Sequence, residues 1–185
     1  MARSLTLATG VLVALSAGSA AAQSATDTKS FTVTGNVPAL CSGGTIAGTG
    51  STFDLGVLID TTTGLLRTDL AAPPKVLTGS FCSSRSTITV NATPLAAQNF
   101  TATAPAGFSR TVDYTATASG WTPTAATFAT GAGSNPGAVQ TRPTAFSGDI
   151  TVAIGTFSTN GGSGLRLVSD TSYLGVVTVT LAVAN

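Results

Sequence analysis

The C-terminal stretch Tyr173-Leu-Gly-Val-Val-Thr-Val-Thr-Leu-Ala-Val-Ala-Asn185 decides the fold class, because apolar and small or polar residues alternate along it. A period of two residues is typical of a β-strand with one buried face and one solvated face. A terminal apolar strand leaves a sheet edge that something must cover, since an open edge is a template for pairing with another chain. Val177, Val179, Leu181 and Val183 share one face of this strand, and we expect its open edge to be covered by this chain or by a neighbour.

The rest of the chain has the same character. It contains no His, its seven acidic residues are all Asp, and Lys, Gln and Met are scarce, so strong helix formers are few. Thr, which suits a pleated sheet, is abundant. Short alternating segments separated by Gly, Pro and Asn turns predict an all-β chain that folds as a single-domain antiparallel β-sandwich. Further strands are expected at 31–37, 52–58, 76–82, 86–92, 99–103, 111–119, 149–155 and 165–168, and within 121–130.

Residues 1–22 have the pattern of a signal peptide. Arg3 gives a basic start, Leu5 to Ala17 form an apolar core, and Ala20-Ala21-Ala22 make a small-residue cleavage site. The alternative is a buried N-terminal helix, but the segment has no amphipathic face. We therefore expect an exported protein that passes through the periplasm to the cell surface or the medium. The sandwich would then occupy residues 23–185, with no integral membrane segment left after cleavage.

The charges of residues 23–185 cancel. Arg3 is one of eight basic residues, which leaves seven against seven Asp. A surface without a basic stripe does not favour nucleic acid or anionic lipid as a partner.

Cys41 and Cys82 are the only cysteines. An exported chain meets an oxidising compartment, so we expect one disulfide between them; two buried free thiols are the alternative. Without His or further Cys, a zinc site is not credible.

No catalytic constellation is visible. The absence of His rules out Ser-His-Asp and Cys-His arrangements, and the two Lys residues after Arg3 sit in no recognisable Ser-Lys motif. Asp54, Asp60 and Asp69 match no calcium-loop spacing and are interpreted as turn carboxylates. We therefore expect a protein that is not an enzyme, has no cofactor and has no metal site.

Two aromatic residues allow two interpretations. Tyr114 and Trp121 could form a stacking platform for a sugar, in a monomeric secreted carbohydrate-binding or adhesive module. The other interpretation is core packing, since a lone Trp in a small sandwich is usually central.

Four features together resemble the spore-coat-U-like and archaic chaperone-usher pilin family of bacterial surface subunits. They are the alternating segment Phe31 to Val37 before Cys41, the stretch Phe53-Asp-Leu-Gly56, Cys82 between two strands, and Tyr173 ahead of a Thr/Val-rich terminal strand.

The resemblance implies a structural subunit of a cell-surface or pilus-like assembly. Family subunits are immunoglobulin-like sandwiches that lack their final strand, which an N-terminal extension of the next subunit supplies by β-strand addition. Here the donor strand would be residues 28–37, with Phe31, Val33 and Val37 facing inward. The acceptor edge would be formed by Val177, Val179, Leu181 and Val183. The expected partners are copies of the chain or related subunits, and a periplasmic chaperone in transit. The residues alone leave open a second arrangement, in which 31–37 pairs within its own chain.

Overall fold

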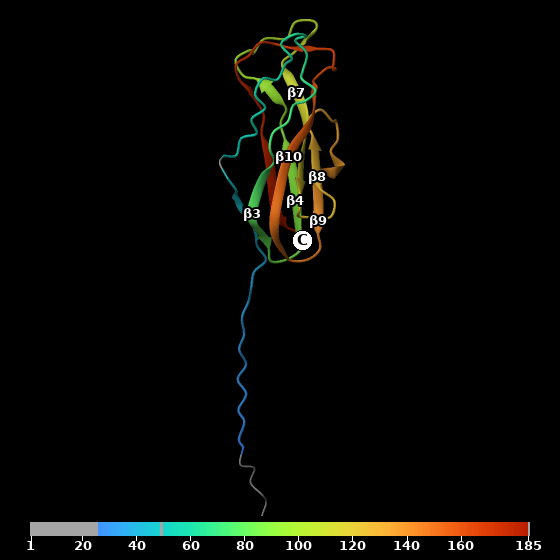
Figure 1. Cartoon of the computed structure of the whole chain (residues 1–185). Helices are drawn as coiled ribbons and strands as arrows, with labels where there is room; N and C mark the ends of the chain where they lie inside the picture. Colours follow the sequence, from blue (N-terminus) through green and yellow to red (C-terminus); the bar gives the residue numbers. More distant parts are fainter. Residues whose placement is uncertain (1–25, 49, 185) are drawn as a thin grey trace, which may run out of the picture. The chain divides into compact units, whose positions relative to one another are not determined.

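The structure is a computed structural model that describes residues 26–48 and 50–184 (Figure 1). The expected signal peptide at 1–22 lies outside these residues. The chain divides after Asn36 into two units, and every assigned strand lies in the second, Val37–Asn185. Within the described part of the chain, no helix has the length and apolarity that crossing a membrane requires.

The larger sheet forms one layer of an antiparallel β-sandwich. Its strands follow the order β1-β3-β10-β7-β5-β12, and β2 and β8 add to β3 and β7. The bounds are β1 Cys41–Ser42, β2 Thr45–Ile46, β3 Lys75–Cys82, β5 Leu95–Ala97, β7 Thr111–Ser119, β8 Ala126–Ala129, β10 Phe146–Thr159 and β12 Tyr173–Leu174.

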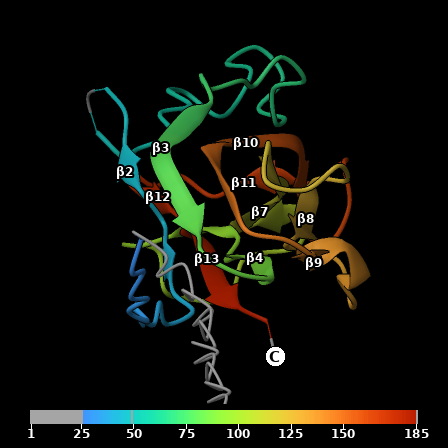
Figure 2. The same cartoon turned by 90° about the horizontal axis from the view of Figure 1, so that it is seen from below.

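The smaller sheet forms the opposite layer and has the order β13-β4-β9. It consists of β4 (Ser86–Ala92), β9 (Val139–Arg142) and β13 (Val177–Val183). Figure 2 shows these strands in one layer, with β10 and β7 across from them. A short parallel pair of β6 (Phe108–Ser109) and β11 (Arg166–Leu167), and a 3-10 turn at Pro136–Ala138, complete the elements.

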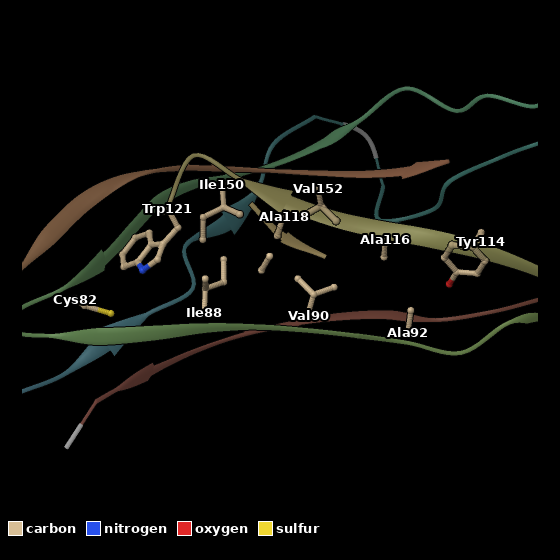
Figure 3. Packing of buried hydrophobic residues seen from close by; sticks show 11 residues of the cluster. Cys82, Ile88, Val90, Ala92, Tyr114, Ala116, Ala118, Trp121, Ile150 and Val152 are labelled. Atoms are coloured by element: carbon tan, nitrogen blue, oxygen red, sulfur yellow. The ribbon is translucent and has the colours of Figure 1, made fainter. Parts of the chain in front are cut away.

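The core lies between the two layers because each strand alternates buried and exposed residues. Ile88 and Val90 of β4 point toward Ala118 and Val152 of the larger sheet (Figure 3). Trp121 is fully buried and donates from Nε1 to Ser86 Oγ at 3.2 Å, so its one polar group is satisfied. The prediction of an all-β sandwich is therefore confirmed.

The expected disulfide is present. Cys41 of β1 and Cys82 of β3 are direct cross-strand partners and are bonded. Because β1 has only two residues, this bond is its strongest attachment to the larger sheet.

Two expected strands have no ladder with any other described residue. Residues 26–40 and 52–58 carry no strand assignment, so the interpretation of 31–37 as a strand paired in its own chain is wrong for this structure. The pattern at 99–103 forms no strand either, whereas β9 was not expected.

The terminal stretch is divided at Gly175. β12 pairs with β5 in the larger sheet, and β13 pairs with β4 in the smaller one, so the chain changes layers between them. A Cβ at Gly175 would lie 2.8 Å from the carbonyl oxygen of Thr93, which explains glycine at this crossing.

Candidate functional site: an open groove beside the terminal strand

The terminal strand β13 is an edge strand. It pairs with β4 along its whole length, from Val177 opposite Ala92 to Val183 opposite Ser86, and no described strand pairs with its other side. Val177, Val179 and Leu181 are half-buried and pack against the core, while the residues between them are exposed. One row of main-chain groups of β13 therefore remains available for pairing.

A groove of about 940 Å³ opens next to the start of this strand. One wall is the segment 51–59, and the other is 167–177, which includes β12. Leu95, Tyr114 and Ile154 also line it. Val57, Leu174 and Val176 are each about 60 % exposed (59 %, 59 % and 60 %), so apolar side chains stand uncovered on both walls.

The wall at 52–58 joins no sheet, and Gly56 within it has a φ of 62° and donates from its N–H to Asp54 Oδ1. Phe53 and Leu55 alternate with exposed neighbours and are half-buried, and Phe53 packs against the core. Its end is held where Ile59 bridges Leu66 and Arg67 N–H donates to the carbonyl of Leu58. The groove thus lies between the wall that contains the edge strand β12 and a segment without a ladder partner.

Tyr114 lines the groove and is hydrogen-bonded to the wall at 167–177. Its ring is buried, lies 6.2 Å from that of Phe157, and its Oη donates to the carbonyl of Val176 at 3.3 Å. Burial raises the pKa of the Tyr114 hydroxyl, so this group stays a neutral hydrogen-bond donor at neutral pH.

Asp170 fastens the wall that contains β12. Its carboxylate accepts hydrogen bonds from the backbone N–H groups of Phe100 (2.7 Å), Asn99 (2.8 Å) and Ser172 (2.8 Å), and from Asn99 Nδ2 (2.8 Å). The bond from Phe100 is the largest cause that lowers the pKa of Asp170 to about 2. Tyr173 Oη donates to the carbonyl of Val168 at 2.7 Å and closes the same loop.

This arrangement gives a pH-dependent stability. The folded pKa of Asp170 is lower than its ordinary value of 3.8, so its contribution is complete above about pH 4 and is lost as pH falls toward 2. We expect Asp170→Asn to flatten the fall of the thermal midpoint between pH 5 and pH 2. Calorimetry across that range measures it, with Asp27→Asn as control, and parallel curves for wild type and Asp170→Asn would contradict the assignment.

The two rings that the sequence offered as a sugar platform belong to the core. Trp121 is 0 % exposed and Tyr114 is 4 % exposed. A stacking platform must present a ring face to solvent. The platform interpretation is therefore wrong for both residues, and the core interpretation is correct.

The three acidic residues weighed as calcium ligands are engaged locally. Asp54 Oδ1 accepts from Gly56 N–H at 2.9 Å, and Asp60 Oδ1 accepts from Thr62 (2.7 Å) and Thr63 (3.0 Å). The bonds from Thr63 and Thr62 lower the pKa of Asp60. Asp69 pairs with Arg67 at 2.7 Å. Each carboxylate therefore stabilises its own turn.

Residues 26–36, which precede the second unit in the chain, contain exposed apolar side chains. Phe31 is 88 % exposed and Val33 is 94 % exposed, although both alternate with polar residues in the way of a half-buried strand. Large apolar side chains at such exposure stabilise nothing within the chain.

Sequence reasoning identified the edge strand and expected a strand at 52–58, but it did not indicate that this segment and 167–177 form the walls of a groove. Leu95, Ile154 and Val176 come from three separate segments and were not singled out, because no local pattern indicates that they meet.

Comparisons of the chain with protein-family models, curated proteins and solved structures found no significant match.

Proposed function

We propose that the chain is an exported structural subunit of a bacterial cell-surface or pilus-like assembly, and that it polymerises by donor-strand exchange. The observation that carries this proposal is that one molecule contains both a strand edge without a partner and a strand-like segment without a partner. β13 is an open edge beside an apolar groove. In the segment 28–37, apolar residues alternate with polar ones as in a strand, but the segment forms no ladder with the described residues.

The two features are chemically complementary. A donor strand along β13 would satisfy the free row of main-chain groups and add a fourth strand to the β13-β4-β9 sheet. Phe31, Val33 and Val37 share one face of such a strand and would cover the half-buried side chains of β13 and the groove. Burying a Phe or Val side chain contributes roughly 1.5–3 kcal/mol each, which favours exchange over exposure.

Export is part of the proposal. The leader-like sequence of residues 1–22 and the Cys41–Cys82 disulfide both suit an oxidising compartment. An open edge strand is an aggregation hazard before assembly. A periplasmic chaperone that covers β13 in transit is therefore the partner that the proposal requires, as the resemblance to chaperone-usher pilins implies.

The test compares the two faces of the donor strand. Wild type should form ladders of bands that survive mild detergent on a non-reducing gel. Phe31→Glu with Val33→Glu should abolish the ladder, because two carboxylates would have to be buried. Thr32→Glu with Thr34→Glu is the matched control, since these residues face outward, and it should keep the ladder.

Two results would overturn the proposal. One is a wild-type chain that remains a stable monomer when purified from the periplasm. The other is a ladder of equal strength in the Phe31→Glu, Val33→Glu variant.

A further inference from the structure

The outer face of the smaller sheet is built from threonine and other small uncharged residues. The register places Thr178 beside Asn91, Thr180 beside Thr89, and Ala182 beside Thr87. β9 extends the same rows with Val139 beside Thr89 and Thr141 beside Thr87. We call this surface the threonine face, defined by Thr87, Thr89, Asn91, Thr178, Thr180 and Ala182 together with the two β9 residues.

The hydroxyls of this face are unused within the described part of the chain. Thr87, Thr89, Thr141, Thr178 and Thr180 make no side-chain hydrogen bond with another described residue, although hydroxyls elsewhere, such as Thr93 and Thr130, do. Val139 is 52 % exposed among them. The surface thus offers hydroxyls and methyl groups in regular rows to whatever lies outside it.

The strands that form the threonine face contain one charged residue, Arg142. Arg142 is the charged residue of β9, but it turns inward: Nη1 donates to the carbonyl of Trp121, and the guanidinium lies 3.4 Å from the centre of the Phe146 ring. Arg85 lies in the turn before β4. β4 and β13 contain no charged residue. The rows of β4 and β13 themselves therefore offer a charged partner no complementary group, and the exposed Arg85 stands at their end.

The donor segment continues the same pattern. If Phe31 and Val33 face inward, Thr32, Thr34 and Asn36 face outward. The outward residues of 32–36 then read Thr-x-Thr-x-Asn, which is also the pattern of Thr87, Thr89 and Asn91 in β4. In the exchanged strand they would lie beside Thr178, Thr180 and Ala182 of β13. Strand exchange would widen the threonine face by one strand of matching chemistry.

We propose that the threonine face is a lateral docking surface for the same face of a second copy of this chain in a neighbouring filament. A hydroxyl is both donor and acceptor, so a face of hydroxyls is complementary to a copy of itself. No charge is desolvated on either side, which removes the main cost of burying a polar surface. This inference rests on the proposed polymerisation.

The threonine face of one subunit is too small to form a stable interface by itself. The seven residues of β13, at about 3.4 Å each, span roughly 24 Å, and three strands about 4.8 Å apart cover roughly 14 Å, or roughly 300 Å² per subunit. A stable interface buries about 800 Å² per partner. One subunit pair therefore holds weakly, whereas a polymer repeats the contact along its length and gains avidity.

The test separates lateral association from polymerisation. Full-length chain is assembled into filaments, and bundles are measured by low-speed sedimentation and electron microscopy in about 0.1 M and about 1 M salt. The face variant carries Thr89→Lys and Ala182→Lys, which are diagonal neighbours on adjacent strands. The matched control carries the same added charge in exposed loops, through Thr61→Lys and Thr144→Lys.

Wild type and the loop control should sediment as bundles in both salts, because contacts between neutral faces are not screened. The face variant should keep the detergent-resistant ladder and lose the bundles, giving single filaments at about 0.1 M salt. Face-variant filaments that bundle like wild type would overturn the inference alone. So would wild-type filaments that stay single, or that associate only when a neutral polysaccharide is added. Absence of any wild-type ladder would overturn the inference together with the proposed function.

Discussion

Replacing both cysteines by alanine is expected to lower the free energy of unfolding by about 4 kcal/mol. The Cys41–Cys82 bond closes a loop with a sequence separation of 41, and the chain-entropy model gives about this value for such a loop. Within this loop lies the groove wall at 52–58, which has no ladder to hold it. The loss should therefore weaken the groove as well as the fold.

Denaturant unfolding with and without reductant measures this effect. Wild type should lose stability when reductant is added, and the Cys41→Ala, Cys82→Ala variant should not respond. A difference below about 1 kcal/mol between wild type and variant would show that the sandwich holds this loop without the bond.

Trp121→Ala is the second change with a large expected effect. Trp121 is fully buried, its ring meets that of Phe146 edge to face with centroids 5.2 Å apart, and it satisfies Ser86 Oγ. Removing it leaves a cavity in the core, for which a loss of about 3–5 kcal/mol is typical.

Trp121→Phe is the matched variant, because it keeps an aromatic ring and loses the indole N–H. We expect its loss to be clearly smaller than that of Trp121→Ala in the same equilibrium unfolding experiment. Equal stability of Trp121→Ala and wild type would contradict the central place of this ring in the core.

The fold could be predicted from sequence because its signal is local. The alternation in Val177–Val183 and in Ser86–Ala92 records which face of each strand is buried, and both segments are strands as expected. The disulfide followed from the presence of two cysteines in a chain with a leader-like start. Short strands such as Val139–Arg142 could not be predicted, because four residues after a Gly-rich loop carry little pattern.

The strand with which a segment pairs, by contrast, cannot be predicted from the local sequence. Residues 31–37 alternate as clearly as β13 does, yet they form no strand in the described chain. Alternation shows that one face of a segment is suited to burial, but it does not say against which sheet or in which molecule. The same reasoning explains 52–58, in which Phe53 and Leu55 are half-buried although the segment has no ladder. The groove itself required the structure, since its walls and floor come from distant segments.

The central claim is that β13 accepts a strand with the sequence of residues 28–37, and hydrogen exchange tests it most directly. The full-length Phe31→Glu, Val33→Glu variant would be studied alone, with a peptide of residues 26–37, and with the same peptide carrying both Glu substitutions. We predict that the native peptide slows exchange of backbone amides in Val177–Val183 and in 52–58, and that the substituted peptide does not. Unchanged exchange in Val177–Val183 with the native peptide at saturating concentration would contradict the account.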